Sequence, residues 1–169
     1  NSKKMPDLNT YLAFISTESY PVLNIFYGGE GAISFTDEGV KGRVWSGKLA
    51  TKFSGGVGTK AEPYLIETPE QLAYLIAGGG GFEGAYYKLT ADIKLNDTSK
   101  ANWQEKAHQW FAGMGIFRGV FDGNGHVVSG LYYNGEENGS AYAAGLFQRL
   151  GCDSVVMRVG LVNSKIYAN

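Results

Sequence analysis

Short β-rich runs between Gly- and Asn-rich turns fill the second half of the chain, and this pattern most constrains the fold. Residues 117–134 (FRGVFDGNGHVVSGLYYN) and 143–169 (AAGLFQRLGCDSVVMRVGLVNSKIYAN) both show it, and neither repeats at the period of a helix. Such runs are typical of successive coils of a solenoid, where each coil leaves an apolar face that only its neighbour covers. Gly and Asn accept the left-handed backbone that tight corners require. The sequence therefore predicts a parallel β-solenoid.

Composition supports an all-β fold and excludes several classes of function. Hydrophobic residues make up 44% of the chain and charged residues 18%, which excludes a disordered polyelectrolyte. The net charge of −1 comes without a basic block, so nucleic acid is not an expected partner. The longest apolar runs are too short to span a bilayer, so we expect no transmembrane segment. The single cysteine, Cys152, permits no intrachain disulfide.

One segment carries a strong helix signal. In residues 68–77 (TPEQLAYLIA), Thr68 suits the N-cap, Pro69 the first helical position, and Gln71 completes a capping box with Thr68. Gly78 then ends the helix. A short amphipathic helix before the first coil would cover apolar side chains and strand edges at the end of a solenoid. We expect this helix to be a cap.

The chain divides into two predicted parts. Residues 1–46 contain short strand-like runs separated by turn signals, which favours a small antiparallel β appendage. Residues 47–169 would form the solenoid with its capping helix. A polar stretch at residues 97–116 interrupts the coils.

Four segments resemble a known family. They are GGVGTKAEPYLIETPEQLAYL (55–75), YYKLTADIKLN (86–96), FRGVFDGNGHVVSGLYYN (117–134) and AGLFQRLGCDSVVMRVGLVNSKI (144–166). In order and spacing they look like bacterial surface, adhesin-like proteins with GLUG-type repeats, similar to the region that precedes the catalytic part of some IgA-specific metallopeptidases. The resemblance implies a right-handed parallel β-helix of pectate-lyase-like shape, secreted or displayed at a bacterial cell surface. Gln148 stands where the family has Gly, and residues 1–44 fall outside the resemblance.

Aromatic side chains offer the binding chemistry that the sequence favours most. Their flat, amphipathic rings suit sugar rings, although aromatic rings in stacked strands more often pack on one another. Trp103 and Trp110 lie in the non-repetitive stretch 97–116, and loops on a rigid scaffold are where recognition usually sits. The candidate ligand-binding residues are Trp103, Trp110, Tyr132, Tyr133 and Tyr142, with host or environmental glycan or protein as partner.

Acidic residues leave catalysis and calcium open as alternatives. Polysaccharide-cleaving solenoids of pectate-lyase-like shape align acidic or calcium-binding residues with a basic residue on one face. Asp92, Asp97 and Asp122, with Arg118 or Arg158, could align in this way. Asp122 in DGNG is more often a turn residue that bonds its own backbone. We predict no catalytic residue and no cofactor, with calcium at these aspartates as the alternative; no metal site is predicted from His108 and His126, because no HExxH motif is present.

The end of the chain still follows the coil pattern. Residues 166–169 precede no polar capping element, so a terminal coil would expose strand edges that another chain could pair with. The chain is then either cut from a longer solenoid or associates head to tail with a second copy, using the N-terminal strands. The leading hypothesis is a non-catalytic, adhesin-like scaffold. A self-assembling, pilus-like filament subunit and a fragment of a polysaccharide-active enzyme are the alternatives.

Overall fold

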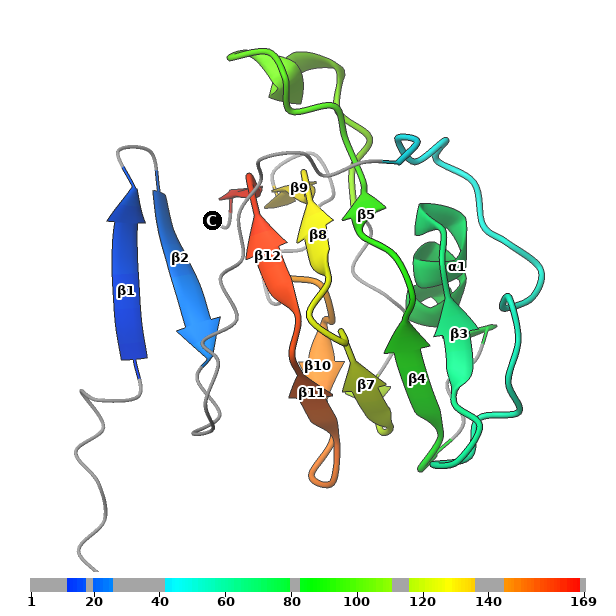
Figure 1. The fold of residues 1–169 in the computed structure, drawn as a ribbon. Helices are drawn as coiled ribbons and strands as arrows, with labels where there is room; N and C mark the ends of the chain where they lie inside the picture. The colour runs from blue at the N-terminus through cyan, green and yellow to red at the C-terminus, as the bar shows by residue number, and fades with distance from the viewer. Residues whose placement is uncertain are drawn as a thin grey trace, which may run out of the picture.

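The computed structural model describes residues 12–17, 20–25, 42–79, 83–110, 116–135 and 145–167. In the N-terminal part only the backbone of two strands is described. Strands β1 (Leu12–Thr17) and β2 (Tyr20–Ile25) form an antiparallel hairpin in which Leu12 faces Ile25 (Figure 1). This hairpin lies within residues 1–46, where a small antiparallel β appendage is predicted, while residues 26–41 of that segment lie outside the described residues.

The strands after residue 42 pair in parallel, so that segments far apart in sequence lie side by side (Figure 1). The ladder through Tyr64, Tyr87, Phe121 and Val156 shows the register, because each residue faces the next across a strand pair. A four-stranded sheet has the order β11-β7-β4-β3 and a three-stranded sheet the order β12-β8-β5, while β10-β6 and β13-β9 are two-stranded. The strands are β3 (Tyr64–Ile66), β4 (Tyr86–Leu89), β5 (Ile93–Lys94), β6 (Ile116–Phe117), β7 (Val120–Asp122), β8 (Val127–Ser129), β9 (Tyr132–Asn134), β10 (Arg149–Leu150), β11 (Val155–Met157), β12 (Gly160–Val162) and β13 (Lys165–Tyr167).

The predicted all-β, right-handed parallel β-helix is wrong. After residue 42, the described strands have two to four residues each and form four small, separate sheets, with no closed solenoid. A helix contributes side chains to the core, so the described chain is not all-β. The physical reason is irregular spacing: β5 ends at Lys94 and β6 begins only at Ile116, so the long intervening stretch breaks any even repeat.

Helix α1 (Pro69–Tyr74) begins as its sequence predicts. The Thr68 side chain accepts a hydrogen bond from the backbone of Gln71, and the Gln71 side chain accepts one from the backbone of Thr68, which confirms the capping box. The helix continues as a π-helical turn, η2 (Leu75–Gly79), in which Gly78 has a φ of 92°. Gly78 thus takes the left-handed conformation that ends helices.

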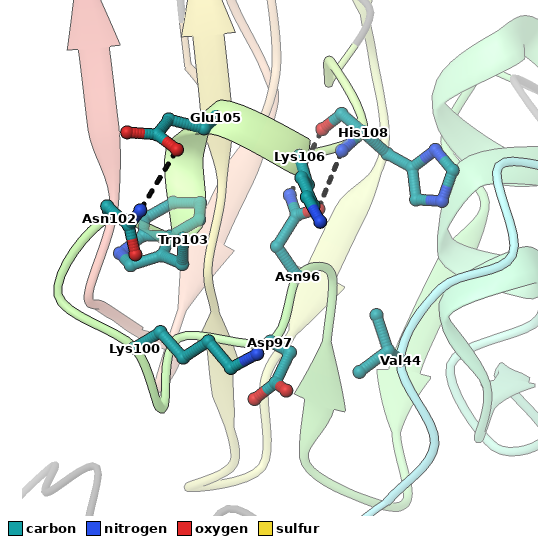
Figure 2. A pocket seen from close by; sticks show the side chains of 9 residues that line it. All are labelled: Val44, Asn96, Asp97, Lys100, Asn102, Trp103, Glu105, Lys106 and His108. Carbon is teal, nitrogen blue, oxygen red and sulfur yellow. Dashed lines mark hydrogen bonds between the residues drawn. The ribbon is translucent and has the colours of Figure 1, made fainter.

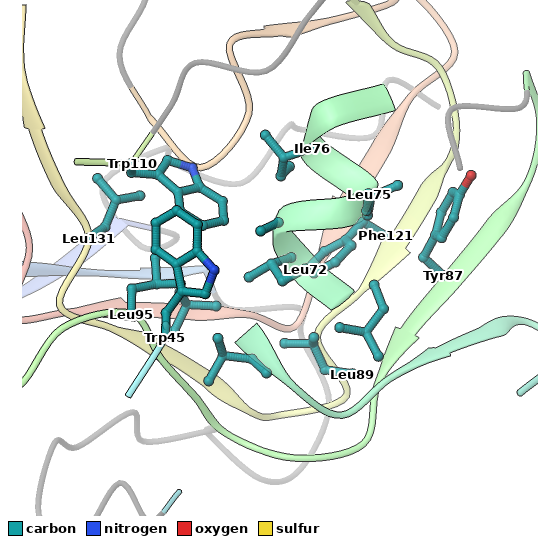
Figure 3. Packing of buried hydrophobic residues seen from close by; sticks show 14 of the residues in the cluster. Trp45, Leu72, Leu75, Ile76, Tyr87, Leu89, Leu95, Trp110, Phe121 and Leu131 are labelled. Atoms are coloured by element: carbon teal, nitrogen blue, oxygen red, sulfur yellow. The ribbon is translucent and has the colours of Figure 1, made fainter. Parts of the chain in front are cut away.

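The core lies between α1 and the strands (Figure 3). Leu72 on α1 and Leu89 and Phe121 on the sheet are fully buried. Trp45 and Trp110 meet edge to face, with ring centroids 5.3 Å apart, and Figure 3 shows Leu131 beside them. Residues 42–46, assigned from sequence to the N-terminal part, therefore contribute Trp45 to the same core as the strands that follow.

Glu70, in the first turn of α1, joins the preceding segment to the helix. Its carboxylate accepts hydrogen bonds from the Arg43 guanidinium and the Ser46 hydroxyl, each at 2.8 Å. Burial raises the pKa of Glu70, but hydrogen bonds from the Ser46 hydroxyl and nearby backbone, with the charge of Arg43, outweigh burial and hold the pKa below its ordinary value. Glu70 is therefore a charged, fully partnered contact between the helix and residues 43–46.

The two edges of the stacked strands differ. On the N-terminal side, Ser54 and Gly55 bond the backbone of Leu65 in β3, and Trp45 donates its backbone N–H to Lys94 in β5. On the other side, strands β10 to β13 are each the outermost strand of their sheet. Among the described residues, their exposed large side chains are Leu150, Val155, Ile166 and Tyr167.

Candidate functional site: two recesses beside Trp103

A loop of residues 97–107 projects between β5 and the buried Trp110, and one side chain closes its base. The amide of Asn96 donates to the carbonyl oxygens of His108 (3.0 Å) and Gly130 (2.8 Å), and its oxygen accepts from the backbone N–H of His108 (2.7 Å). Asn96 is only 4% exposed. These bonds join both ends of the loop to the corner after β8, so the loop stands on a fixed base.

Trp103 lies in this loop, at the start of the short 3-10 helix η3 (Trp103–Lys106). It is half-buried, and its ring meets Tyr132 edge to face at 6.1 Å between centroids. The Lys165 ammonium lies 5.8 Å from the centroid of the indole ring and donates to the Gln104 amide oxygen at 2.8 Å. Packing on Tyr132 and Lys165 holds an indole that still reaches solvent.

The first recess, on one side of the loop, has a volume of about 340 Å³ and is shown in Figure 2. Glu105 accepts a hydrogen bond from the Asn102 amide at 2.9 Å, and Asp97 accepts one from the backbone N–H of Ser99 at 3.3 Å. Hydrogen bonds from Ser99, followed by the charge of Lys94, lower the pKa of Asp97 below its ordinary value. The first recess thus combines charged groups of both signs with apolar surface. Its lining residues are Val44, Asn96, Asp97, Lys100, Asn102, Trp103, Glu105, Lys106 and His108.

The second recess, of about 250 Å³, lies between the loop and the chain that links β12 to β13. Asn163 adopts a left-handed conformation (φ 46°) at this link, and its amide donates to the Thr98 hydroxyl at 3.4 Å. Trp103 and Lys100 line both recesses. The other lining residues are Thr98, Ser99, Ala101, Asn163, Ser164 and Lys165.

The structure separates the aromatic candidates from one another. Trp110 is 1% exposed and donates its indole N–H to the Leu146 carbonyl at 3.2 Å, so it is a core residue. Tyr132 and Tyr133 are also buried, at 8% and 3% exposure. Tyr142 lies outside the described residues. Of the described candidates, Trp103 alone lines these two recesses, and its ring packs edge to face on Tyr132.

The three candidate aspartates are not brought together. Asp92 accepts from His126 Nδ1 at 3.1 Å, and Asp97 faces Lys94 at 3.5 Å. Asp122 pairs with Arg158 and accepts from the backbone N–H of Asn124 at 2.8 Å, which confirms it as a turn residue. The Asp122 partner raises the pKa of Arg158, chiefly through their hydrogen bonds. No group of three or more His, Cys, Asp or Glu residues within the described ranges could hold a metal ion.

Sequence reasoning missed the residues that build the recesses around Trp103. Lys165 and Asn163 lie some sixty residues after the loop in sequence, yet their side chains bond Gln104 and Thr98 of the loop. Asn96 is not among the candidate residues that the sequence points to. The signal available was positional: Asn96 and Asn163 both follow strands of the β12-β8-β5 sheet, and stacked strands bring such positions together.

Comparisons with known proteins give two partial relatives. The chain is 31% identical over 120 residues to a protein of Evansella cellulosilytica named as a Gly-rich membrane protein, and 29% identical over 111 residues to the halomucin of Haloquadratum walsbyi. These alignments cover 68% and 66% of this chain but only 12% and 1% of the relatives. No family model and no solved structure matches, so the resemblance to GLUG-repeat proteins stays a prediction. Within the described part of the chain, no helix has the length and apolar character needed to cross a bilayer.

Proposed function

We propose that the chain is a non-catalytic, glycan-binding module of a larger protein at the membrane or cell surface. The observation that carries this proposal is the placement of Trp103, a half-exposed indole that lines two recesses with both polar and apolar surface. The surface location is supported by the relatives, one of which is named as a membrane protein and the other as a halomucin. Both relatives are much longer than this chain, which supports its role as one module among others.

The chemistry of the recesses suits a sugar better than an apolar ligand. Sugar rings combine apolar C–H faces with hydroxyl groups, so a sugar site needs a flat aromatic side chain surrounded by hydrogen-bonding groups. Trp103 offers the flat surface, and Asn102, Glu105 and Lys106 offer donors and acceptors on one side. The volumes lie near the lower limit for small-molecule sites, which fits contact with one or two sugar units rather than enclosure of a long chain.

A glycan array tests the proposal with matched variants of the full chain. Trp103→Ala should remove at least about nine-tenths of the signal of any bound glycan, because stacking on an aromatic ring is lost. Tyr86→Ala is the control: Tyr86 is also a partly buried aromatic residue, but it lines a different recess with Arg118 and Cys152. Equal binding by Trp103→Ala and the wild type, or no binding of any glycan by the wild type, would refute the proposal.

Self-association is a second candidate function, and the outer edge of the strands favours it. Strands β10, β11 and β13 end their sheets with Leu150, Val155, Ile166 and Tyr167 exposed, while β12 lies against β2, and apolar edges of this kind pair with other chains. Because residues 54–55 and 45 already bond β3 and β5 on the opposite edge, contact through a second copy of the outer edge fits better than head-to-tail stacking. Such a contact is self-complementary about a two-fold axis and closes as a dimer.

Light scattering at rising protein concentration tests this second candidate. The wild type should shift from monomer to dimer, and Ile166→Lys should restore the monomer by placing a charge in the contact. Val57→Lys is the matched control, since Val57 is also an exposed apolar residue (60%) but lies outside strands β10 to β13. A wild type that stays monomeric at millimolar concentration removes the candidate.

A further inference from the structure

The second recess differs from the first in the sign of its charged residues. Lys100 and Lys165 line it, and none of its lining residues carries a carboxylate. We infer that the second recess binds the anionic substituent of an acidic sugar, a carboxylate or a sulfate ester, while Trp103 contacts the ring. This inference rests on the proposed glycan binding and names the class of glycan.

Lys165 is placed to receive an anion. Its side chain is partly buried, and its ammonium is held by the Gln104 amide oxygen and by the face of the Trp103 ring. Neither contact neutralises its charge, and among the described residues no carboxylate lies within ion-pair distance of Lys165. An ammonium has three donors, so further donors remain for a ligand. Because the group is fixed and partly desolvated, an anion gains more here than beside a fully hydrated lysine.

The first recess does not share this property. Asp97 and Glu105 line it together with Lys100 and Lys106, so an anion entering it meets carboxylates as well as ammonium groups. Hydrogen bonds from Ser99 keep the pKa of Asp97 low, so its carboxylate is charged at neutral pH. A ligand that lies across Trp103 is therefore oriented, with its acidic substituent on the side of Asn163 and Lys165 and its neutral hydroxyl groups on the side of Asn102.

Calorimetric titration of the full chain with two forms of one sugar tests the inference. The probes are a hyaluronan tetrasaccharide, which carries glucuronate carboxylates, and its methyl ester, which has the same rings without the charge. The wild type should bind the acid form about tenfold more tightly than the ester, as expected for a hydrogen bond to a charged group. The preference should shrink as salt rises from 50 to 500 mM, since salt screens exposed charges (roughly 14 Å and 4 Å Debye lengths).

Three variants assign the preference to a residue. Lys165→Met keeps an unbranched side chain against Trp103 and should abolish the preference, while Lys165→Arg should retain most of it. Lys88→Met is the matched control, since Lys88 is also a partly buried lysine but lines neither recess, and it should change either affinity by less than about twofold. A methyl-esterified chondroitin sulfate tetrasaccharide, which keeps only sulfate charges, separates the two anions: whichever acidic probe loses affinity in Lys165→Met identifies the substituent and supports the inference.

The outcomes distinguish this inference from the function on which it rests. If the wild type binds acid and ester equally and Trp103→Ala binds neither, glycan binding stands and the acidic preference is refuted. If the acid form is preferred but Lys165→Met and the wild type agree, the second recess is not the site. If no probe binds, the inference is refuted, and the glycan array judges glycan binding separately.

Discussion

Asn96 determines whether the loop that carries Trp103 keeps its shape, and its replacement tests the structure most directly. The side chain makes three hydrogen bonds to backbone groups of His108 and Gly130, at 2.7 to 3.0 Å, from a position that is 4% exposed. Asn96→Ala removes all three bonds and leaves the two carbonyl groups and one N–H without these partners. At about 1 kcal/mol net for each bond, we expect the free energy of unfolding to fall by about 3 kcal/mol.

Thermal unfolding followed by tryptophan fluorescence measures this loss, because Trp110 is buried beside the loop. For a chain of this size each kcal/mol lowers Tm by roughly 2–4 °C, so Asn96→Ala should melt about 6–12 °C below the wild type. Trypsin offers a second measurement. Cleavage after Lys100 and Lys106 should become faster, since the base of the loop is no longer closed.

A matched variant and a charge variant sharpen the test. Asn102→Ala removes one exposed hydrogen bond to Glu105 and should shift Tm by no more than about 2 °C. Asn96→Asp keeps the shape but points a carboxylate at two carbonyl oxygens, which raises its pKa in the folded state. Its deficit relative to the wild type should therefore shrink as pH falls and the carboxyl group becomes protonated. A Tm for Asn96→Ala within 2 °C of the wild type, or equal to that of Asn102→Ala, would refute this account of the loop.

Three further predictions concern the core, a turn and an ion pair. Trp110→Ala should cost about 3–5 kcal/mol and Trp103→Ala only about 1 kcal/mol, measured by urea unfolding, since one indole is buried and the other half-exposed; equal losses would contradict the assignment. Gly130→Ala should cost about 1–3 kcal/mol by the same assay, because Gly130 has a φ of 74° and a Cβ there would lie 2.8 Å from the carbonyl oxygen of Asn96; an unchanged midpoint would count against this geometry. The lowered pKa of Glu70 predicts a contribution to the free energy of unfolding that is constant above the ordinary glutamate pKa of about 4.3 and is lost as pH drops through the lower folded value. Glu70→Gln should therefore flatten the acid dependence of stability. An unaltered pH profile of unfolding would exclude the Glu70 carboxylate as its source.

Features that depend on residues close together in sequence could be predicted. The capping box of α1 involves residues three apart, and the Asp122 turn involves residues two apart, so both follow from sequence. The parallel pairing of distant β-rich runs was also predicted, from short runs set between Gly- and Asn-rich turns. The prediction of a closed solenoid was wrong, because closure depends on how far each sheet extends and how the corners join. The stretch between β5 and β6 interrupts the repeat of strands that closure requires. The Gly-rich segment before β3 also depends on contacts that its sequence does not show: Ser54 and Gly55 bond Leu65 in β3, Gly58 accepts from Tyr86 in β4, and a Cβ at Gly56 would lie 1.9 Å from the Pro63 carbonyl oxygen.

Trp103 and Trp110 show why the site could be predicted only in part. Both lie in one polar stretch, seven residues apart, so the sequence predicts a ligand-binding role equally for each. They differ in burial because Trp45, far earlier in the chain, packs on Trp110. Trp103 instead meets Tyr132 edge to face, has the Lys165 ammonium over its ring and still reaches solvent. The contacts that bury one indole and orient the other are tertiary, so no window along the sequence contains them. A side chain in such a loop can bind a ligand only if the rest of the fold leaves it exposed, and its exposure depends on strands that are distant in sequence.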